Sequence, residues 1–282
     1  MRIDLHTHSS CSDGTDTPAE LMAAAAAAGL DVVALTDHDT TRGWAEAVAA
    51  LPSGLRLVRG AEISCAYGEV SLHLLAYLID PHHEALAEQM SMALDDRVPR
   101  AKAIVAKLAA AGYPITWEAV LAQLQDGATV GRPHIADTLI QAGVAKDRTE
   151  VFDRLLHDGS EFFVGHYYVD AVEAVRLVRA AGGVPVLAHP GAVKRGPTVS
   201  DEGIRAMAAA GLAALEIDHR DNQPESRERL LGLAGELDLL VTGASDYHGA
   251  GKENRLGENT TSPEVFDALL AQAAGTIDIM PT

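Results

Sequence analysis

Short apolar runs in this chain repeatedly end in a residue that can bind a metal ion. The first run leads into His6-Thr7-His8, which carries two histidines one residue apart. Because residues i and i+2 of a β-strand point to the same face, both imidazoles are expected to project together from the strand end. Six segments of this kind predict a metal site at the mouth of a parallel barrel. The candidate ligands are His6, His8, Asp13, His38, Glu62, His73, His189, Asp246 and His248.

The apolar runs alternate with helix-like segments in the first part of the chain. Thr17 to Glu20 has the form of a capping box, and the alanine-rich run that follows it has strong helix propensity. A second helix is expected over 41–51, and strands are expected over 31–36, up to Glu62 and over 70–77. Such alternation implies right-handed βα units and a parallel sheet.

Residues 82–164 break this alternation. The segment is helix-like throughout, with helices expected over 101–111, 117–124, 134–142 and 149–157. It is too long for an ordinary connection, so we interpret it as a helical insertion covering the barrel mouth. Alternation then resumes, and residues 1–81 and 165–282 are predicted to form one α/β barrel of about seven strands.

Composition limits the functions that this chain can have. The 282 residues include 40 acidic and 22 basic ones, for a formal charge of −18, which argues against binding long double-stranded nucleic acid. A small anionic substrate stays possible, because divalent cations bound to the protein reverse the sign of the local electrostatic field. Two cysteines are too few for a disulfide scaffold, and no apolar stretch is long enough for a bilayer. We therefore expect a cytoplasmic protein without membrane attachment.

The ligand types indicate which metals fit. Histidine and carboxylate without thiolate suit Mn²⁺, Zn²⁺ or Fe²⁺. Each residue alone has a structural explanation, such as a turn at Ser12-Asp13-Gly14. Together, however, the candidates exceed the capacity of one ion, so two or three ions sharing a bridging carboxylate are expected. Glu62 is the bridging candidate, because it is the only carboxylate at a central strand end.

Taken in order, these motifs resemble the polymerase and histidinol phosphatase (PHP) family of metal-dependent phosphoesterases. The matching segments are Asp4-Leu5-His6-Thr7-His8 followed by Asp13, Thr36-Asp37-His38, Glu62, His189-Pro190 and Asp246-Tyr247-His248. The resemblance implies a distorted (β/α)7 barrel with a trinuclear centre, most readily of manganese. It implies three ligand sets: His6, His8, Glu62 and Asp246; Glu62, His73 and His189; Asp13, His38 and His248. Glu62, Asp246 and His248 are assigned the catalytic roles.

Within the family, the long insertion is similar to that of a branch acting on small phosphate esters. This implies hydrolysis of the 3′-phosphate of nucleoside 3′,5′-bisphosphates by a metal-activated hydroxide. An alternative is 5′–3′ exonuclease activity on short RNA. A carbon–nitrogen hydrolase of the amidohydrolase type also begins with His-x-His, but it often uses a strand-end lysine where this chain has Glu62. A non-catalytic metal-stabilised module is a further alternative.

Four side chains are candidates for substrate binding. Arg132 and His134 flank a proline that stiffens the turn between them, although an exposed loop at a helix start explains them equally well. Lys194, with Arg195 beside it, follows His189-Pro190, and His219 follows the strand that ends at Asp218. The histidines interpreted as non-ligands are His82, His83, His157 and His166.

Overall fold

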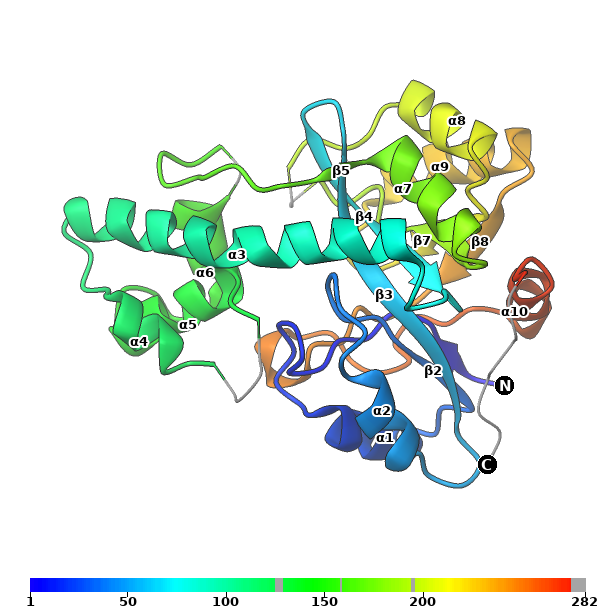
Figure 1. Ribbon diagram of the computed structural model, residues 1–282, viewed down its shortest axis with the longest axis horizontal. Helices are drawn as coiled ribbons and strands as arrows, with labels where there is room; N and C mark the ends of the chain where they lie inside the picture. Colours follow the sequence, from blue (N-terminus) through cyan, green and yellow to red (C-terminus); the bar gives the residue numbers. More distant parts are fainter. Residues whose placement is uncertain (125–128, 158, 194–195, 275–282) are drawn as a thin grey trace.

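The sheet is nearly closed into a barrel. The structure, a computed structural model, describes residues 1–124, 129–157, 159–193 and 196–274. One path of hydrogen-bonded strands runs in the order β1-β2-β3-β4-β6-β7-β8, and a short β5 pairs with β3 (Figure 1). An isolated parallel bridge between Thr7 and Tyr247 connects its two ends. The strands are β1 (Ile3–Asp4), β2 (Val32–Leu35), β3 (Arg56–Tyr67), β4 (Val70–Tyr77), β5 (Val169–Asp170), β6 (Val184–Leu187), β7 (Ala214–Asp218) and β8 (Leu240–Gly243).

Helices pack around this sheet, and the expected distorted α/β barrel is confirmed. One apolar cluster lies between the sheet and the surrounding helices, and a second joins strand residues such as Ile3 and Val186 to Phe266 of the last helix. Every residue of β2 and β6 is buried, as expected for strands covered on both faces. The surrounding helices are α1 (Pro18–Ala27), α2 (Trp44–Ala49), α7 (Ala171–Ala180), α8 (Asp201–Ala209), α9 (Pro224–Glu236) and α10 (Pro263–Leu270).

The prediction of an all-parallel sheet is wrong at β4. This strand runs antiparallel to both β3 and β6. The reason is the connection: β3 and β4 are separated by only two residues, of which Gly68 has a φ of +60°. Parallel neighbours need a crossover of a dozen residues or more, whereas a tight turn joins antiparallel ones. The register sets Ser64 opposite His73.

Every element described between residues 84 and 156 is a helix, and these helices form a smaller lobe beside the barrel. The long helix α3 runs from the barrel into this lobe (Figure 1). Its 27 residues continue through Pro99. The lobe has its own apolar cluster, which includes Leu108, Ile135 and Leu139. None of the helices described is long and apolar enough to cross a membrane. The lobe comprises most of α3 (Glu84–Ala110) with α4 (Trp117–Leu121), α5 (Arg132–Gln141), α6 (Arg148–Val151) and η1 (Phe152–Leu156).

Two arginines connect the lobe to loops at one end of the barrel. Arg42, after β2, donates to Thr129 Oγ1 at 2.6 Å. Arg148, in α6, donates to the Gly251 carbonyl at 3.2 Å and holds Asp137 with two further bonds of 2.7 and 2.6 Å. The lobe is therefore fixed beside the loops that follow β2 and β8.

Candidate metal centre

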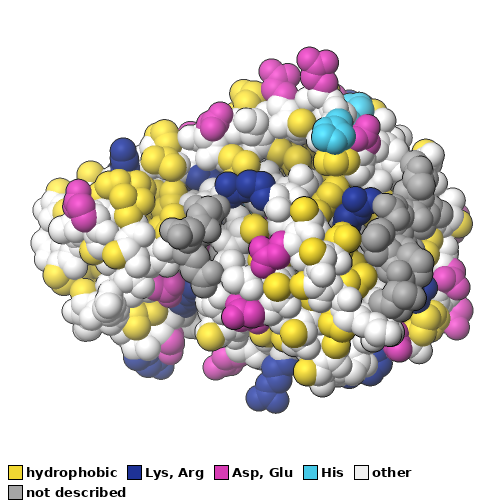
Figure 2. Space-filling model, turned by 60° about the horizontal axis from the view of Figure 1, so that its bottom comes forward, with side chains coloured by type: hydrophobic (Ala, Val, Ile, Leu, Met, Phe, Trp, Pro, Cys, Tyr) yellow, Lys and Arg dark blue, Asp and Glu magenta, His cyan; other side chains and the backbone are white. Residues whose placement is uncertain are grey.

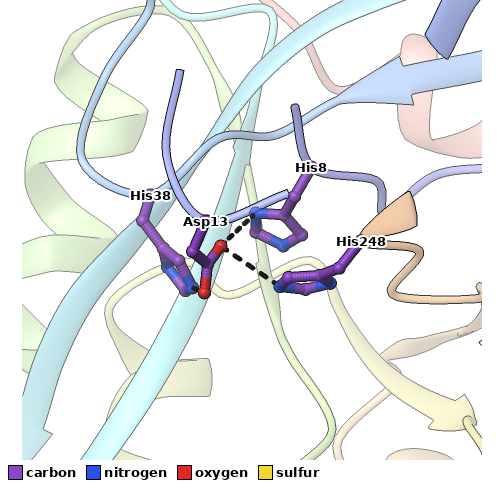
Figure 3. A group of neighbouring side chains, drawn as sticks. All are labelled: His8, Asp13, His38 and His248. Atoms are coloured by element: carbon purple, nitrogen blue, oxygen red, sulfur yellow. Dashed lines mark ion pairs between the residues drawn. The ribbon is translucent and has the colours of Figure 1, made fainter. Parts of the chain in front are cut away.

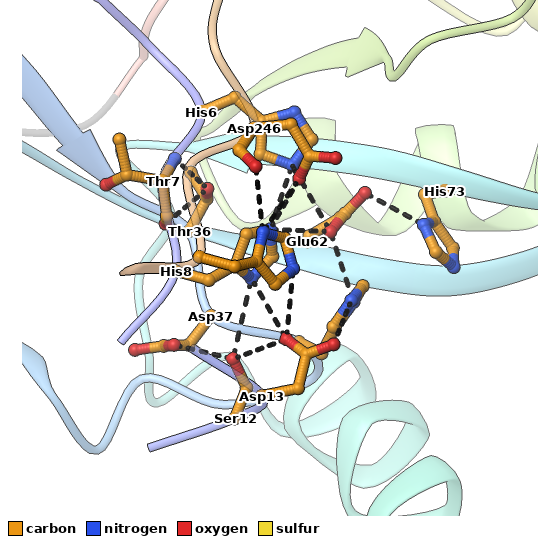
Figure 4. A network of polar contacts seen from close by, with 12 residues as sticks. His6, Thr7, His8, Ser12, Asp13, Thr36, Asp37, Glu62, His73 and Asp246 are labelled. Carbon is orange, nitrogen blue, oxygen red and sulfur yellow. Dashed lines mark hydrogen bonds and ion pairs between the residues drawn. The ribbon is translucent and has the colours of Figure 1, made fainter. Parts of the chain in front are cut away.

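All nine predicted ligands converge at one end of the barrel. Figure 4 shows part of this group, with His6, His8, Asp13, Glu62, His73 and Asp246 labelled. The parallel strands β1, β2, β6 and β8 end there, and the hairpin of β3 and β4 passes through the same region. Most of these side chains are almost completely buried. His6 and His8 follow β1, Asp13 lies in the next loop, His38 follows β2, Glu62 lies in β3, His73 lies in β4, His189 follows β6, and Asp246 and His248 follow β8.

Glu62 lies at the centre of the cluster and faces two groups of histidines. Its Oε1 is 2.9 Å from His73 Nδ1 and 3.2 Å from His189 Nε2. Its Oε2 is 3.3, 3.1 and 3.1 Å from ring nitrogens of His6, His8 and His38, respectively. A carboxylate with a different histidine set at each oxygen has the geometry of a bridging ligand.

A second group of ligands surrounds Asp13 (Figure 3). Asp13 Oδ1 lies 3.2 Å from His248 Nε2 and 3.8 Å from His8 Nδ1, and Oδ2 lies 3.8 Å from His38 Nε2. The ring centroids of His8 and His248 are 4.1 Å apart. Asp13 therefore joins side chains from three separate strand ends.

Asp246 connects the central group to the edge of the cluster. Its Oδ1 is 3.4 Å from His6 Nε2 and 3.3 Å from His8 Nε2. Its Oδ2 lies 3.0 Å from Lys252 Nζ and 3.6 Å from His219 Nε2. Asp246 has a φ of +55°, an unusual backbone for a non-glycine residue, and such outliers concentrate at functional sites.

The charge state of Glu62 and several ring nitrogens without a hydrogen bond indicate that the cluster suits divalent cations. Burial tends to raise the pKa of Glu62, but the neighbouring His73 and His38 hold it well below its usual range. In the described chain, buried nitrogens of His38, His73 and His248 make no hydrogen bond, although a carboxylate oxygen lies within 3.2 Å of each. Imidazole nitrogens and carboxylate oxygens converging without thiolate form a donor set for Mn²⁺, Zn²⁺ or Fe²⁺.

Comparison with known proteins decides the family. The family model described as "PHP domain" matches residues 4–169. The chain belongs to the PHP domain family. It is 34% identical over 254 residues to the 3′,5′-nucleoside bisphosphate phosphatase of Chromobacterium violaceum, covering 90% of this chain and 89% of that protein.

Two further relatives cover nearly the whole chain. The 5′-3′ exoribonuclease of Haemophilus influenzae is 34% identical over 248 residues, covering 88% of this chain and 90% of that enzyme. A solved structure described as a metal-dependent phosphoesterase from Bifidobacterium adolescentis is 42% identical, with a TM-score of 0.91. That match covers 98% of this chain and 97% of the other. The barrel and the lobe of this PHP protein therefore both have counterparts in a solved relative.

Sequence analysis missed a carboxylate behind the ligands of this PHP domain. Glu216, in β7, is fully buried; its Oε1 lies 2.9 Å from His6 Nδ1, and its Oε2 accepts the His189 backbone N–H at 2.9 Å. When Nδ1 of His6 carries the ring proton and donates it to Glu216, Nε2 is the unprotonated nitrogen, and it faces His8, Glu62 and Asp246. The signal available in the sequence was a charged residue within the apolar run of β7.

The four predicted substrate contacts differ in their positions. Arg132 donates to the Leu156 carbonyl at 2.9 Å, and its guanidinium lies 5.6 Å from the ring centre of Phe152, so this side chain packs within the lobe. His134 is buried near the metal cluster: burial lowers its pKa, and the Asp13 carboxylate partly opposes that shift. His219 is fully buried beside Asp246. Lys194 lies outside the described residues.

Proposed function

We propose that this chain is a metal-dependent phosphatase acting on small nucleotides, with the 3′-phosphate of nucleoside 3′,5′-bisphosphates as its main target. The observation that carries the proposal is the position of Glu62 between two histidine groups, beside a third group around Asp13. Phosphoryl transfer uses closely spaced cations that contact both the attacking and the leaving oxygen. The Chromobacterium violaceum relative supports the substrate.

Two or three divalent ions, most readily Mn²⁺, with Zn²⁺ or Fe²⁺ as alternatives, complete the site that we propose. They supply Lewis-acid chemistry, neutralising charge on the phosphoryl oxygens and lowering the pKa of water. The ligand sets that we assign are His6, His8, Glu62 and Asp246; Glu62, His73 and His189; and Asp13, His38 and His248.

The chain's own residues hold these groups and limit access to them. Glu62, Asp246 and His248 are the residues to which we assign catalytic contact. In our proposal residues 82–164 act as an insertion over the barrel mouth and restrict it to small substrates. On the face shown in Figure 2, acidic and basic side chains are interspersed among the described residues, which does not favour long nucleic acid. We also propose a cytoplasmic location, in keeping with a nucleotide substrate.

Exonuclease action on short 5′-phosphorylated RNA is the second candidate. It rests on the Haemophilus influenzae relative, whose identity and coverage nearly equal those of the phosphatase. Carbon–nitrogen hydrolysis is less supported, because the central bridging position carries Glu62 rather than lysine.

The test is phosphate release from Mn²⁺-loaded protein. We expect rapid release from nucleoside 3′,5′-bisphosphates, slower release from monophosphates, and no ammonia from amide substrates. Preferential release of mononucleotides from short RNA would favour the exonuclease, and inactivity toward every phosphate ester would overturn the proposal.

A variant then tests the bridging residue. Glu62→Gln is expected to lose bound metal and activity together, because one oxygen of the bridge becomes an amide. The control is Glu69→Gln, an exposed residue of the same hairpin, which is expected to keep both. Normal metal content and rate in Glu62→Gln would contradict the assignment.

A further inference from the structure

Arg97 lies on α3 where this helix passes the barrel, and one edge of its guanidinium is anchored there. Nη2 donates to Asp39 Oδ2 at 2.6 Å and lies 3.5 Å from Ser64 Oγ. Asp39 directly follows His38, and Ser64 is paired across the hairpin with His73. Arg97 is thus fixed next to two residues assigned as metal ligands, although it comes from the helical lobe.

The Nη1 amino group of the guanidinium remains available. Within the described part of the chain, all hydrogen bonds of Arg97 run through Nη2, and its buried Nε has no partner. The side chain is 14% exposed. The Nε–H lies on the same edge of the guanidinium as Nη2, but Nη1 carries two further N–H donors, and these can still bind an oxyanion.

A small space separates Nη1 from His134. A Cβ added at Gly131 would lie 3.8 Å from Arg97 Nη1 and 4.0 Å from His134 Nδ1, so the lack of a side chain at residue 131 keeps this space open. His134 Nδ1 accepts the Gly131 N–H at 3.0 Å, which in the neutral ring leaves the proton on Nε2. Arg97 therefore supplies a fixed positive charge at this space, whereas the His134 nitrogen that borders it is an acceptor already bound to the Gly131 N–H.

We propose that Arg97 binds the phosphate of the substrate that is not cleaved. This inference rests on the proposed function, in which the metal cluster holds the reacting phosphate. A nucleoside 3′,5′-bisphosphate carries its second anion across a ribose, beyond the reach of the same ions. Arg97 supplies a cation beside the cluster, whereas the guanidinium of Arg132 packs on Phe152 within the lobe.

Two matched substrates test the subsite. A nucleoside 3′,5′-bisphosphate and the corresponding 3′-monophosphate share the reacting group and differ only in the second phosphate. In Arg97→Met we expect kcat/KM for the bisphosphate to fall roughly 10- to 100-fold, the range for a charge-assisted contact, and that for the 3′-monophosphate to change less than about twofold. Arg154→Ala, in an exposed part of the lobe, is the control and should alter neither. Equal loss on both substrates, or loss on neither, would overturn the proposal.

Two additional measurements keep the test decisive. Gly131→Leu fills the gap beside Nη1 and keeps both Arg97 and Asp39 in the sequence, so it should show the same selective loss even if Arg97→Met is unstable. If the wild-type protein hydrolyses neither substrate, the proposed function fails. The subsite is then judged by calorimetry of a nucleoside 5′-monophosphate on metal-loaded protein saturated with inorganic phosphate. Binding at least about tenfold weaker in Arg97→Met would support it, and unchanged binding would refute it.

Discussion

One buried carboxylate supports two of the residues proposed as metal ligands. The two oxygens of Glu216 lie against the His6 ring nitrogen Nδ1 and the His189 backbone N–H. Both contacts need an acceptor oxygen. A residue at this position can therefore affect metal binding without touching a metal ion.

Glu216→Gln is expected to weaken metal binding while leaving the fold intact. Glutamine offers one acceptor and one donor, so one of the two contacts made by Glu216 is lost. Loss of such a supporting contact typically costs about 10- to 100-fold in metal affinity. Equilibrium dialysis with elemental analysis measures this, with the exposed Glu228→Gln on α9 as the control. Equal affinity in the two variants would show that Glu216 has no part in the site.

The sequence predicts the residues that meet at the centre far better than those that support it. Strand-end motifs mark most of the proposed ligands locally, because parallel strands deliver their ends to one place, whereas Glu62 and His73 lie within the hairpin of β3 and β4. Glu216 and Arg97 carry no such motif. Glu216 meets His6 across 210 positions of the chain, and Arg97 is one charged residue in a polar helix. Only the folded chain shows which of many such side chains is buried.

At the scale of elements, strand positions follow from the apolar pattern but strand direction does not. The pattern over 70–77 predicts a strand, and β4 has these bounds. Its direction depends on the two-residue turn containing Gly68, which allows only a hairpin. Similarly, Pro99 suggests a break, yet α3 continues through it, because packing of Ala93, Ala101 and Ile104 outweighs the local propensity.

The segment returning from the lobe is attached to α3 by His166. Its Nδ1 lies 2.8 Å from Asp96 Oδ2, and this oxygen also accepts the Tyr167 N–H at 2.8 Å. Burial, together with Arg97 and Arg100, lowers the pKa of His166 to about 4. An unfolded histidine titrates near 6.5, so between pH 6.5 and 4 the unfolded chain binds more protons at this site.

The stability that His166 contributes should therefore be lost as the pH falls from about 6.5 to 4. His166→Gln is expected to show a shallower decline in the free energy of unfolding over this range than the wild-type protein. Urea unfolding at a series of pH values measures the difference, with the exposed His157→Gln as the reference substitution. Identical pH slopes for wild type and His166→Gln would contradict the assigned pKa.

At the scale of the whole molecule, the two ends of the sheet meet through few backbone contacts. Thr7 and Tyr247 form one bridge, and the His8 N–H donates to the Tyr247 carbonyl at 2.8 Å. The centre adds side chains from both ends, since His6 and His8 follow the first strand and Asp246 follows the last. Ions bound there would close the barrel where its hydrogen bonding is sparse.

Metal removal should consequently lower thermal stability as well as activity. A ligand that binds only the folded state stabilises it by about 4 kcal/mol at a thousandfold excess over Kd. For a domain of this size that corresponds to a Tm shift on the order of 10 °C. Calorimetric Tm should thus fall on chelation and rise with added Mn²⁺, and on chelation hydrogen exchange should increase first at β1 and β8.

Glu216→Gln should reach the same upper Tm only at higher Mn²⁺ concentration. A Tm independent of Mn²⁺, with exchange at β1 and β8 unchanged, would show that the barrel closes without the ions and that the cluster serves chemistry alone.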